Sequence, residues 1–259
     1  MKEFFQNYPY LWASLLSLFV FVTLSVLLLR KDHRNTVIFS GLVNSTCFVF
    51  LIHLEGVYWS PVRLGHRLLG MEDVICSFIV AAMAWFAVAL VLGNRIVYAF
   101  RAEVWMKRFI SLAGASVALF LLLCQIGWSG MTALVVTCLS VGSTTLWWRR
   151  DLWPLALAGT LIFPLLYLLV LKIDFWIWPR FVEQWNAVGP WGRGYWGIPL
   201  GEIAWSVVFG LYWPLFTGHI FDISLKRHLS QPAPVVGIGR HIRSALTPLA
   251  RRPSRSSSA

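Results

Sequence analysis

Charged residues are scarce in this chain of 259 residues. Asp, Glu, Lys and Arg together make up 13% of it, and only 11 residues are acidic. Hydrophobic residues make up 58%, and the mean hydropathy is +0.68. These values lie well outside those of a soluble globular domain. Because apolar runs of about 20 residues can cross a bilayer as helices, we predict an all-α, polytopic membrane protein.

Cysteine is also rare, and its placement excludes two kinds of site. The spacing of the four cysteines suits neither a disulfide framework nor a zinc site. All four fall inside predicted spans, where we expect them to be small buried hydrophobic residues, and we expect no bound metal ion. They are Cys47, Cys76, Cys124 and Cys138.

Two further absences exclude two classes of membrane protein. No pair of acidic residues has the spacing of the Asp-rich, magnesium-binding clusters that a polyprenyl transferase needs. The last apolar run, residues 199–220, contains no lysine, which a retinal protein needs for its Schiff base. Neither class is compatible with this chain.

Seven apolar runs are long enough to be spans. Most of the 22 Lys and Arg residues lie on the side opposite to the N-terminus, so the positive-inside rule predicts a cell-membrane protein with its N-terminus outside and its C-terminus in the cytoplasm. Basic cytoplasmic segments, which can meet anionic lipid headgroups, account for the net charge of +11 without nucleic acid. The predicted spans are residues 10–29, 36–52, 71–92, 105–124, 131–147, 152–171 and 199–220.

The chain divides into a membrane domain, residues 1–225, and a basic tail, residues 226–259. The tail is rich in Ser, Pro and Arg, and a segment of this composition cannot bury enough apolar surface to fold alone. We therefore predict a disordered tail on the cytoplasmic side.

Two acidic segments each open an apolar run that is long enough to span a bilayer. Glu72 and Asp73 open the third predicted span, and Glu202 opens the seventh. A charged side chain near the bilayer centre costs about 2.5 to 3.5 kcal/mol on insertion scales, so such residues usually face a bundle interior or a pathway. The three carboxyl groups are therefore the candidate catalytic residues. Their alternative role is that of helix caps at headgroup level, stabilised by the helix dipole.

The matching placement of the two acidic segments also predicts an internal duplication. Spans one to three, about residues 8–92, and spans five to seven, about residues 131–221, form two three-helix units that the fourth span joins. With one helix between them, the units have the same orientation, so we predict parallel repeats related by a pseudo-two-fold axis along the membrane normal. Both acidic segments then lie on the same side of the membrane.

Helical geometry narrows the pairing of these acids. Glu72 and Asp73 are adjacent, so their side chains diverge by about 100° and do not face each other. We therefore expect the functional pair to join one of them to Glu202. Aromatic residues follow Glu202 on one helix face, where they either line an apolar channel and hold a cation by cation–π attraction or simply pack between helices. They are Trp205, Phe209, Tyr212 and Phe216.

These residues carry a resemblance to a known family. The segments GMEDVICSF and GIPLGEIAWSVVFGLYWPLF resemble the two Pro-x-Glu-Glu helix starts of the small membrane-embedded lycopene cyclases. The second segment is the more similar, in its Gly-Ile-Pro-Leu start, its Trp205 and its Gly-Leu-Tyr-Trp-Pro run. The chain departs from the family pattern in having Gly70 in place of Pro, Asp73 in place of the second Glu, and Gly201 in place of the first Glu of the second copy.

The resemblance implies a cofactor-free isomerase that cyclises the end group of a carotenoid or other isoprenoid lipid. An acid protonates a terminal alkene, the neighbouring double bond attacks the cation, and a base removes a proton. A carboxyl group in an apolar cavity suits the first step because desolvation disfavours its charged form, and a second carboxylate suits the last. Glu72, Asp73 and Glu202 would supply these groups, and Trp205, Phe209 and Tyr212 would bind the substrate.

Two other functions remain open from the residues alone. Parallel repeats around intramembrane acids also describe proton-coupled carriers, in which the three carboxyl groups would be proton sites. A non-catalytic membrane partner of an isoprenoid-pathway enzyme would dock through the aromatic outer loops or the basic tail. A partner subunit or a second copy of the chain is compatible with each of these functions.

Overall fold

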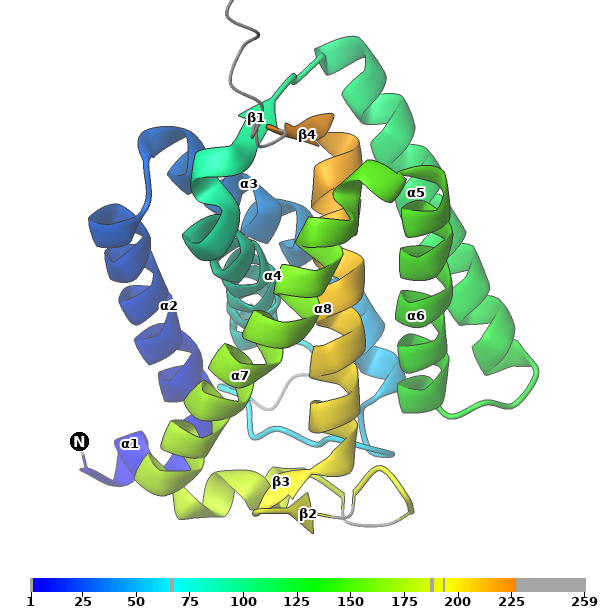
Figure 1. Cartoon of the computed structure of the whole chain (residues 1–259). Coiled ribbons are helices and arrows are strands. Elements are labelled where there is room, and N and C mark those ends of the chain that lie inside the picture. The colour runs from blue at the N-terminus through cyan, green and yellow to red at the C-terminus, as the bar shows by residue number, and fades with distance from the viewer. Residues whose placement is uncertain (1, 66–67, 187–188, 193, 227–259) are drawn as a thin grey trace, which may run out of the picture. The chain divides into compact units, whose positions relative to one another are not determined.

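The computed structural model describes residues 2–65, 68–186, 189–192 and 194–226, and it is mostly helical (Figure 1). The predicted tail lies outside these residues except for Lys226. The α-helices are α1 (Lys2–Asn7), α2 (Pro9–Leu28), α3 (Lys31–Ser45), α4 (Met71–Leu92), α5 (Ala102–Gln125), α6 (Gly130–Trp148), α7 (Trp153–Ile177) and α8 (Leu200–Ile220). The 3₁₀ helices and strands are η1 (Phe48–His53), η2 (Gly93–Arg95), η3 (Arg150–Leu152), η4 (Pro179–Gln184), β1 (Ile96–Tyr98), β2 (Gly194–Tyr195), β3 (Ile198–Pro199) and β4 (Ile223–Leu225).

Six helices of the described residues are long and apolar enough to cross a membrane, namely α2, α4, α5, α6, α7 and α8. The predicted span over residues 36–52 differs, because α3 ends at Ser45 and the chain tightens into η1. The hydroxyl groups of Ser45 and Thr46 donate to the carbonyls of Leu42 and Val43, three residues earlier. Such local bonds compete with the i to i−4 ladder of an α-helix, which explains the break.

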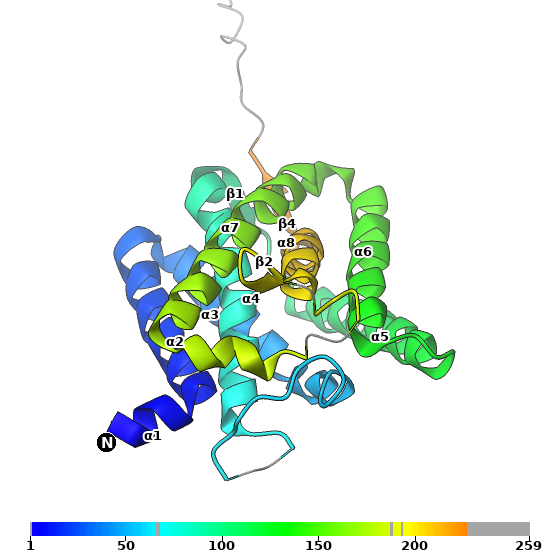
Figure 2. The same cartoon turned by 90° about the horizontal axis from the view of Figure 1, so that it is seen from below.

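The chain alternates between two ends of the bundle. At the first end, which we call the Trp-rich end, Trp178 donates to the carbonyl of Phe5, and Ser60 donates to that of Gln184. At the second, the Arg-rich end, β1 pairs with β4. Figure 1 shows α3 and η1 returning the chain from the Arg-rich end to the Trp-rich end, where α4 begins. Figure 2 shows η4 and the β2–β3 ribbon lying across the Trp-rich end.

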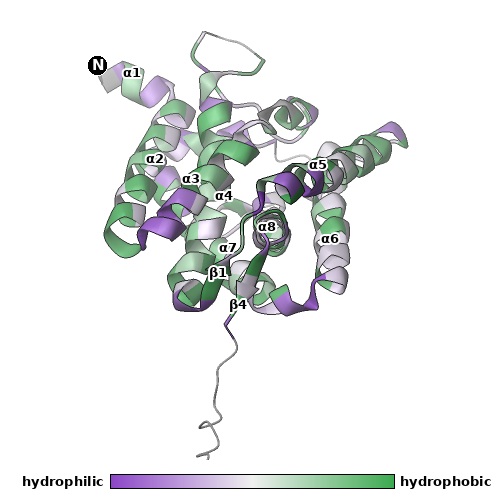
Figure 3. Ribbon diagram, turned by 90° about the horizontal axis from the view of Figure 1, so that it is seen from above, coloured by the Kyte–Doolittle hydropathy of each residue, from purple (hydrophilic) through white to green (hydrophobic). Residues whose placement is uncertain are grey.

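The helices on either side of α5 pack in the same pattern. In the first unit α4 packs on both α2 and α3, and in the second α8 packs on both α6 and α7. The first two helices of each unit share few contacts with each other. Figure 3, seen from the Arg-rich end, shows mostly hydrophobic residues along the helices, with hydrophilic ones near several helix ends, among them the starts of α3 and α5.

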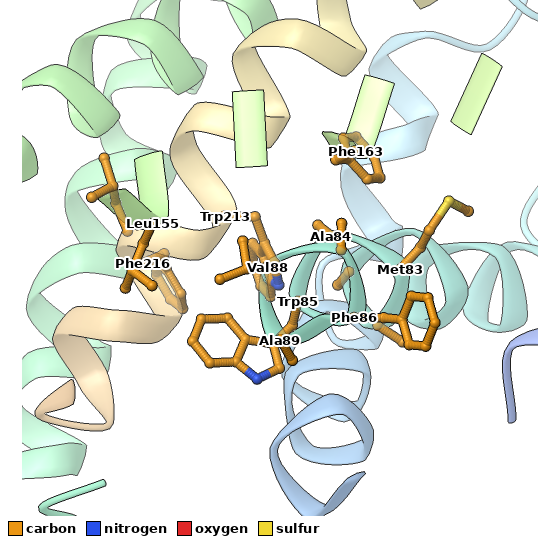
Figure 4. Close-up of a cluster of buried hydrophobic side chains, with 14 of the residues drawn as sticks. Met83, Ala84, Trp85, Phe86, Val88, Ala89, Leu155, Phe163, Trp213 and Phe216 are labelled. Carbon is orange, nitrogen blue, oxygen red and sulfur yellow. The ribbon is translucent and has the colours of Figure 1, made fainter. Parts of the chain in front are cut away.

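The core forms around α4, which is buried along most of its length. Its alanines let neighbouring helices approach closely, and Trp85 is fully buried between them. Figure 4 shows side chains of α7 and α8, among them Phe163 and Phe216, gathered around this part of α4. Ser40 of α3 joins the layers, because its hydroxyl accepts a hydrogen bond from Trp213 of α8 and donates one to the Ala81 carbonyl.

Asp222 follows α8 and ties the Arg-rich end together. Its carboxylate accepts hydrogen bonds from Arg108 at 2.8 Å and Arg101 at 2.7 Å, and Arg149 lies 3.7 Å away. The hydrogen bond from Arg108 is the largest cause that holds the pKa of Asp222 below its ordinary value of 3.8, and burial opposes it. The charged form of Asp222 therefore stabilises the fold above about pH 4, and this contribution is lost as the pH falls through the lowered pKa.

We expect Asp222→Asn to lower the free energy of unfolding by about 1 kcal/mol near pH 7, because the ion pairs are partly exposed. The difference from the unmodified protein should shrink below about pH 4, since both proteins then lack the charge. Thermal unfolding in detergent between pH 3 and pH 7 measures it. Asp32→Asn is the control, because the side chain of Asp32 is 66% exposed. A difference for Asp222→Asn that stays constant with pH would contradict the prediction.

Candidate functional site

A cavity of about 280 Å³ lies inside the bundle, close to the lower limit of small-molecule pockets, about 300 Å³. Its wall is mainly apolar and draws on α2 to α8 as well as η1 and η4. Two acidic side chains of the described residues, Glu202 and Asp174, line it. The four aromatic residues predicted to share a face of α8 line it as well: Trp205, Phe209, Tyr212 and Phe216.

Glu202 lies in the first turn of α8 and is only 8% exposed. Its Oε1 accepts hydrogen bonds from Tyr58 Oη at 2.8 Å and Trp185 Nε1 at 2.7 Å, and its Oε2 accepts one from Tyr167 Oη at 2.5 Å. An ionised carboxylate only accepts hydrogen bonds, so three donors match this form. The site therefore places a carboxyl group with three hydrogen-bond partners against an apolar cavity.

Tyr58 comes from the loop between η1 and α4, and it remains a donor to Glu202. Burial is the main cause that raises the pKa of Tyr58 above its ordinary value of 10.0, and the charge of Glu202 adds to it. The phenol is therefore neutral over the whole physiological range. Its hydroxyl keeps its proton and holds the carboxylate in place.

The absence of a side chain at Gly201 leaves room for the Tyr58 ring beside Glu202. A Cβ atom at position 201 would lie 2.6 Å from Cζ and 2.7 Å from Cε2 of Tyr58, closer than such atoms approach in proteins. The glycine that departs from the lycopene cyclase pattern is therefore required by the position of the Tyr58 ring. A glutamate here would displace the ring from Glu202.

We expect Gly201→Ala to push Tyr58 away from Glu202 and to lower the free energy of unfolding by about 1 to 3 kcal/mol, through overpacking and the lost hydrogen bond. Thermal unfolding in detergent measures the loss. In a Tyr58→Ala background the overlap is gone, so the same glycine substitution should cost little. Equal losses in both backgrounds would show that Tyr58 is not the cause.

Asp73 is engaged in a different set of contacts. Its carboxylate forms an ion pair with Arg63, with Nε at 2.7 Å from Oδ2, and it accepts hydrogen bonds from Tyr10 Oη and the Gly70 backbone N–H. Arg63 also lies 2.9 Å from Glu55. Burial acts to lower the pKa of Arg63, but the hydrogen bonds to Asp73 and Glu55 outweigh it and raise that pKa above its ordinary value of 12.5.

Glu72 and Asp73 therefore anchor the preceding loop to the start of α4. Glu72 accepts a hydrogen bond from the backbone N–H of Leu64 at 2.8 Å. Both side chains are buried, yet the cavity lining includes neither. The alternative role as a helix cap describes Asp73, since it accepts from Gly70 three residues earlier. Among the described residues no hydrogen bond joins Glu72 or Asp73 to Glu202: Asp73 pairs with Arg63, and Glu202 accepts from three other donors.

The aromatic residues of α8 form a continuous stack along the cavity. The ring centroids of Trp205 and Phe209 are 4.8 Å apart, those of Phe209 and Trp213 are 5.5 Å apart, and those of Trp213 and Phe216 are 4.9 Å apart. Trp213 was not among the predicted residues, although it lies about three turns after Glu202 and so shares its helix face. Tyr212 shares a hydrogen bond of 3.0 Å with Ser116. The electron-rich faces of such rings attract cations.

Asp174 is the acidic residue that the sequence did not single out. The predicted sixth span ends at residue 171, whereas α7 continues to Ile177. Lys172 and Asp174 mark a polar boundary in the sequence, but the helix ends only before Pro179. The signal that could have found Asp174 is its spacing of seven residues from Tyr167, which places both on one helix face.

In the described part of the chain, no group of three His, Cys, Asp or Glu side chains is arranged to hold a metal ion. Three of the four cysteines, Cys47, Cys76 and Cys138, line the cavity, and Cys138 is buried.

No family model, curated protein or solved structure matches this chain.

Proposed function

We propose that this protein is a lycopene-cyclase-like membrane enzyme that cyclises an isoprenoid end group without a cofactor. The observation that carries the proposal is a buried carboxylate, Glu202, that faces an apolar cavity beside a stack of aromatic rings. An acid-initiated cyclisation passes through carbocations, which an anion and aromatic faces both stabilise. The resemblance of the segments that open α4 and α8 to the lycopene cyclases supports the same chemistry.

In this proposal the substrate's end group lies against the α8 stack. Trp205 is one helical turn from Glu202, and its ring also packs edge-on against Tyr167, with centroids 5.2 Å apart. A cation that forms over Trp205 and Phe209 would lie within reach of the carboxylate that removes the final proton. The mainly apolar wall disfavours water, which would otherwise capture the cation as an alcohol.

The proposed membrane arrangement has seven spans, with α3 and η1 together forming the second. An α-helix rises about 1.5 Å and a 3₁₀ helix about 2.0 Å per residue, so these two elements have roughly the length of one crossing. We also propose that the two three-helix units are parallel repeats, that the Trp-rich end faces outward, and that the chain resides in the cell membrane. The substrate is a carotenoid or related isoprenoid, and the arrangement is compatible with a partner subunit or a second copy.

Expression in cells that accumulate linear carotenoids tests the proposed activity. Extracted pigments are separated by chromatography, and the expected result is a new pigment of the same mass as its linear precursor but with a cyclic end. Cells with an empty vector are the control. Unchanged lycopene and unchanged linear terpenoids would overturn the proposal. A proton-coupled flux by the purified protein in liposomes would support the alternative of a carrier.

A further inference from the structure

Asp174 is a second carboxyl group in the cavity wall, and neither Glu202 nor the aromatic stack of α8 accounts for it. Only 6% of its surface is exposed, and it lines the same cavity as Glu202. Within residues 2–226 as described, its carboxyl group receives no hydrogen bond and forms no ion pair, and burial alone acts on it. A largely buried acid whose carboxyl group opens into a mainly apolar cavity is unusual, so its role needs an explanation.

The two carboxyl groups line one cavity, and shared neighbours link them. Asp174 lies two turns after Tyr167 on one face of α7, and Tyr167 donates to Glu202. The next residue, Phe175, packs edge-on against Trp185 with centroids 5.4 Å apart, and Trp185 also donates to Glu202. Two of the side chains that donate to Glu202 therefore belong to α7 or pack against the end of α7 that contains Asp174.

The surroundings of these two groups are opposite in kind. Glu202 has three donors, which match an ionised carboxylate. Asp174 has none in the described chain, and an unpaired charge is expensive to bury, so the neutral, protonated acid is the form that this site accommodates. Two carboxyl groups whose environments differ in this way are typical of an acid and a base that act on one substrate.

We propose that Asp174 is the acid that starts the cyclisation and that Glu202 is the base that ends it. This inference rests on the proposed function. The carboxyl proton of Asp174 is transferred to the terminal alkene, whose π electrons form the new C–H bond and leave a tertiary cation. The neighbouring double bond attacks that cation and closes the ring. Glu202 then removes a proton from the ring carbon next to the new cation, and that C–H bond pair becomes the ring double bond.

The reaction is balanced without an oxidant or reductant. One proton is added and one is lost, so the product is an isomer of the substrate. After each turnover Asp174 is ionised and Glu202 is protonated, and a proton must return from Glu202 to Asp174 through the cavity or solvent. This assignment leaves Asp73 and Glu72 as anchoring residues, in agreement with their contacts to Arg63 and Leu64.

Chemical labelling tests the protonation of Asp174 without any activity. Dicyclohexylcarbodiimide enters apolar sites and adds to protonated carboxyl groups to give a stable acylurea, which mass spectrometry locates. We expect the full-length protein in detergent to be labelled at Asp174, less at Glu202, and not at Asp73. The label at Asp174 should fall as the pH rises and should be absent in Asp174→Asn. Labelling at Glu202 in place of Asp174, or at neither, would overturn the inference.

Product formation tests the role of Asp174 in the reaction. We expect Asp174→Asn to lower the amount of cyclic pigment at least about 100-fold, the scale of a lost general acid, and Asp174→Glu to restore part of it. Asp32→Asn is the matched control, and thermal unfolding checks that each variant folds. If Asp174 is labelled but the unmodified protein gives no cyclic pigment, the proposed function is rejected, whereas the protonation of Asp174 is supported. Cyclic pigment from Asp174→Asn at the unmodified level would overturn the inference and keep the function.

Discussion

Glu202→Gln should reduce the cyclic pigment by about 100-fold to 10,000-fold, the range expected for losing a positioned general base. Glutamine has nearly the same shape as glutamate, so the hydroxyl groups of Tyr58 and Tyr167 can still be placed beside it. The negative charge is lost, however, and with it both the base and the electrostatic stabilisation of the carbocation. Pigment from cells that express the variant is quantified by chromatography against the level of membrane-inserted protein.

Glu183→Gln is the matched control for this substitution. Glu183 lies at the same Trp-rich end, in η4, but its side chain is exposed. It should leave the pigment yield unchanged. A yield from Glu202→Gln within about tenfold of the unmodified protein would be too small a loss for a general base, and the mechanism proposed for Glu202 would then be rejected.

Gly159→Ala should destabilise the fold by forcing two closely packed helices apart. Gly159 of α7 and Gly210 of α8 meet at the most extensive helix interface of the described chain. A Cβ atom at Gly159 would overlap the backbone carbonyl of Gly210 and lie 2.6 Å from Cγ of Pro214. A backbone carbonyl cannot rotate away, so α7 and α8 must separate. We expect a loss of about 2 kcal/mol or more, or roughly 4 to 8 °C in the thermal midpoint.

Gly114→Ala separates this overlap from the general effect of replacing a helical glycine. Gly114 lies in α5, and a Cβ atom there would meet nothing within 4 Å. Alanine favours a helix by roughly 0.5 to 1 kcal/mol over glycine, so Gly114→Ala should leave the thermal midpoint unchanged or raise it. If both variants have the same thermal midpoint in detergent, close packing at Gly159 does not limit the stability of the fold.

The separation of α7 and α8 should also disturb the hydrogen bond between Tyr167 and Glu202. Tyr167 follows Gly159 by about two turns on α7, and its hydroxyl spans the interface to Glu202 on α8. We therefore expect the pigment yield of Gly159→Ala to fall even in the fraction of protein that remains folded.

The apolar helices follow closely from the sequence. The predicted spans over residues 71–92 and 131–147 differ from α4 and α6 by at most one residue at either end. The predicted helix ends are less accurate where an α-helix continues beyond its hydrophobic segment. α7 runs six residues beyond its predicted end, because hydropathy reports immersion in lipid, whereas backbone hydrogen bonding continues until Pro179 interrupts it.

Part of the candidate site also follows from the sequence. Glu202 and the α8 residues Trp205, Phe209 and Tyr212 could be named because they share one helix, and spacing along a helix fixes which side chains share a face. All of them line the cavity. Their roles in binding and catalysis stay predictions.

By itself, therefore, the sequence determined that the chain is a multi-pass membrane protein with buried acids at two helix starts, since both follow from local composition and helical periodicity. Only the tertiary structure decided which acid meets which partner. The donors to Glu202 lie 144, 35 and 17 residues away in the chain. Arg63 forms an ion pair with Asp73 because the loop before α4 folds back onto the start of that helix. Whether a buried carboxyl group is charged, paired or free depends on these distant neighbours, and no local pattern specifies them.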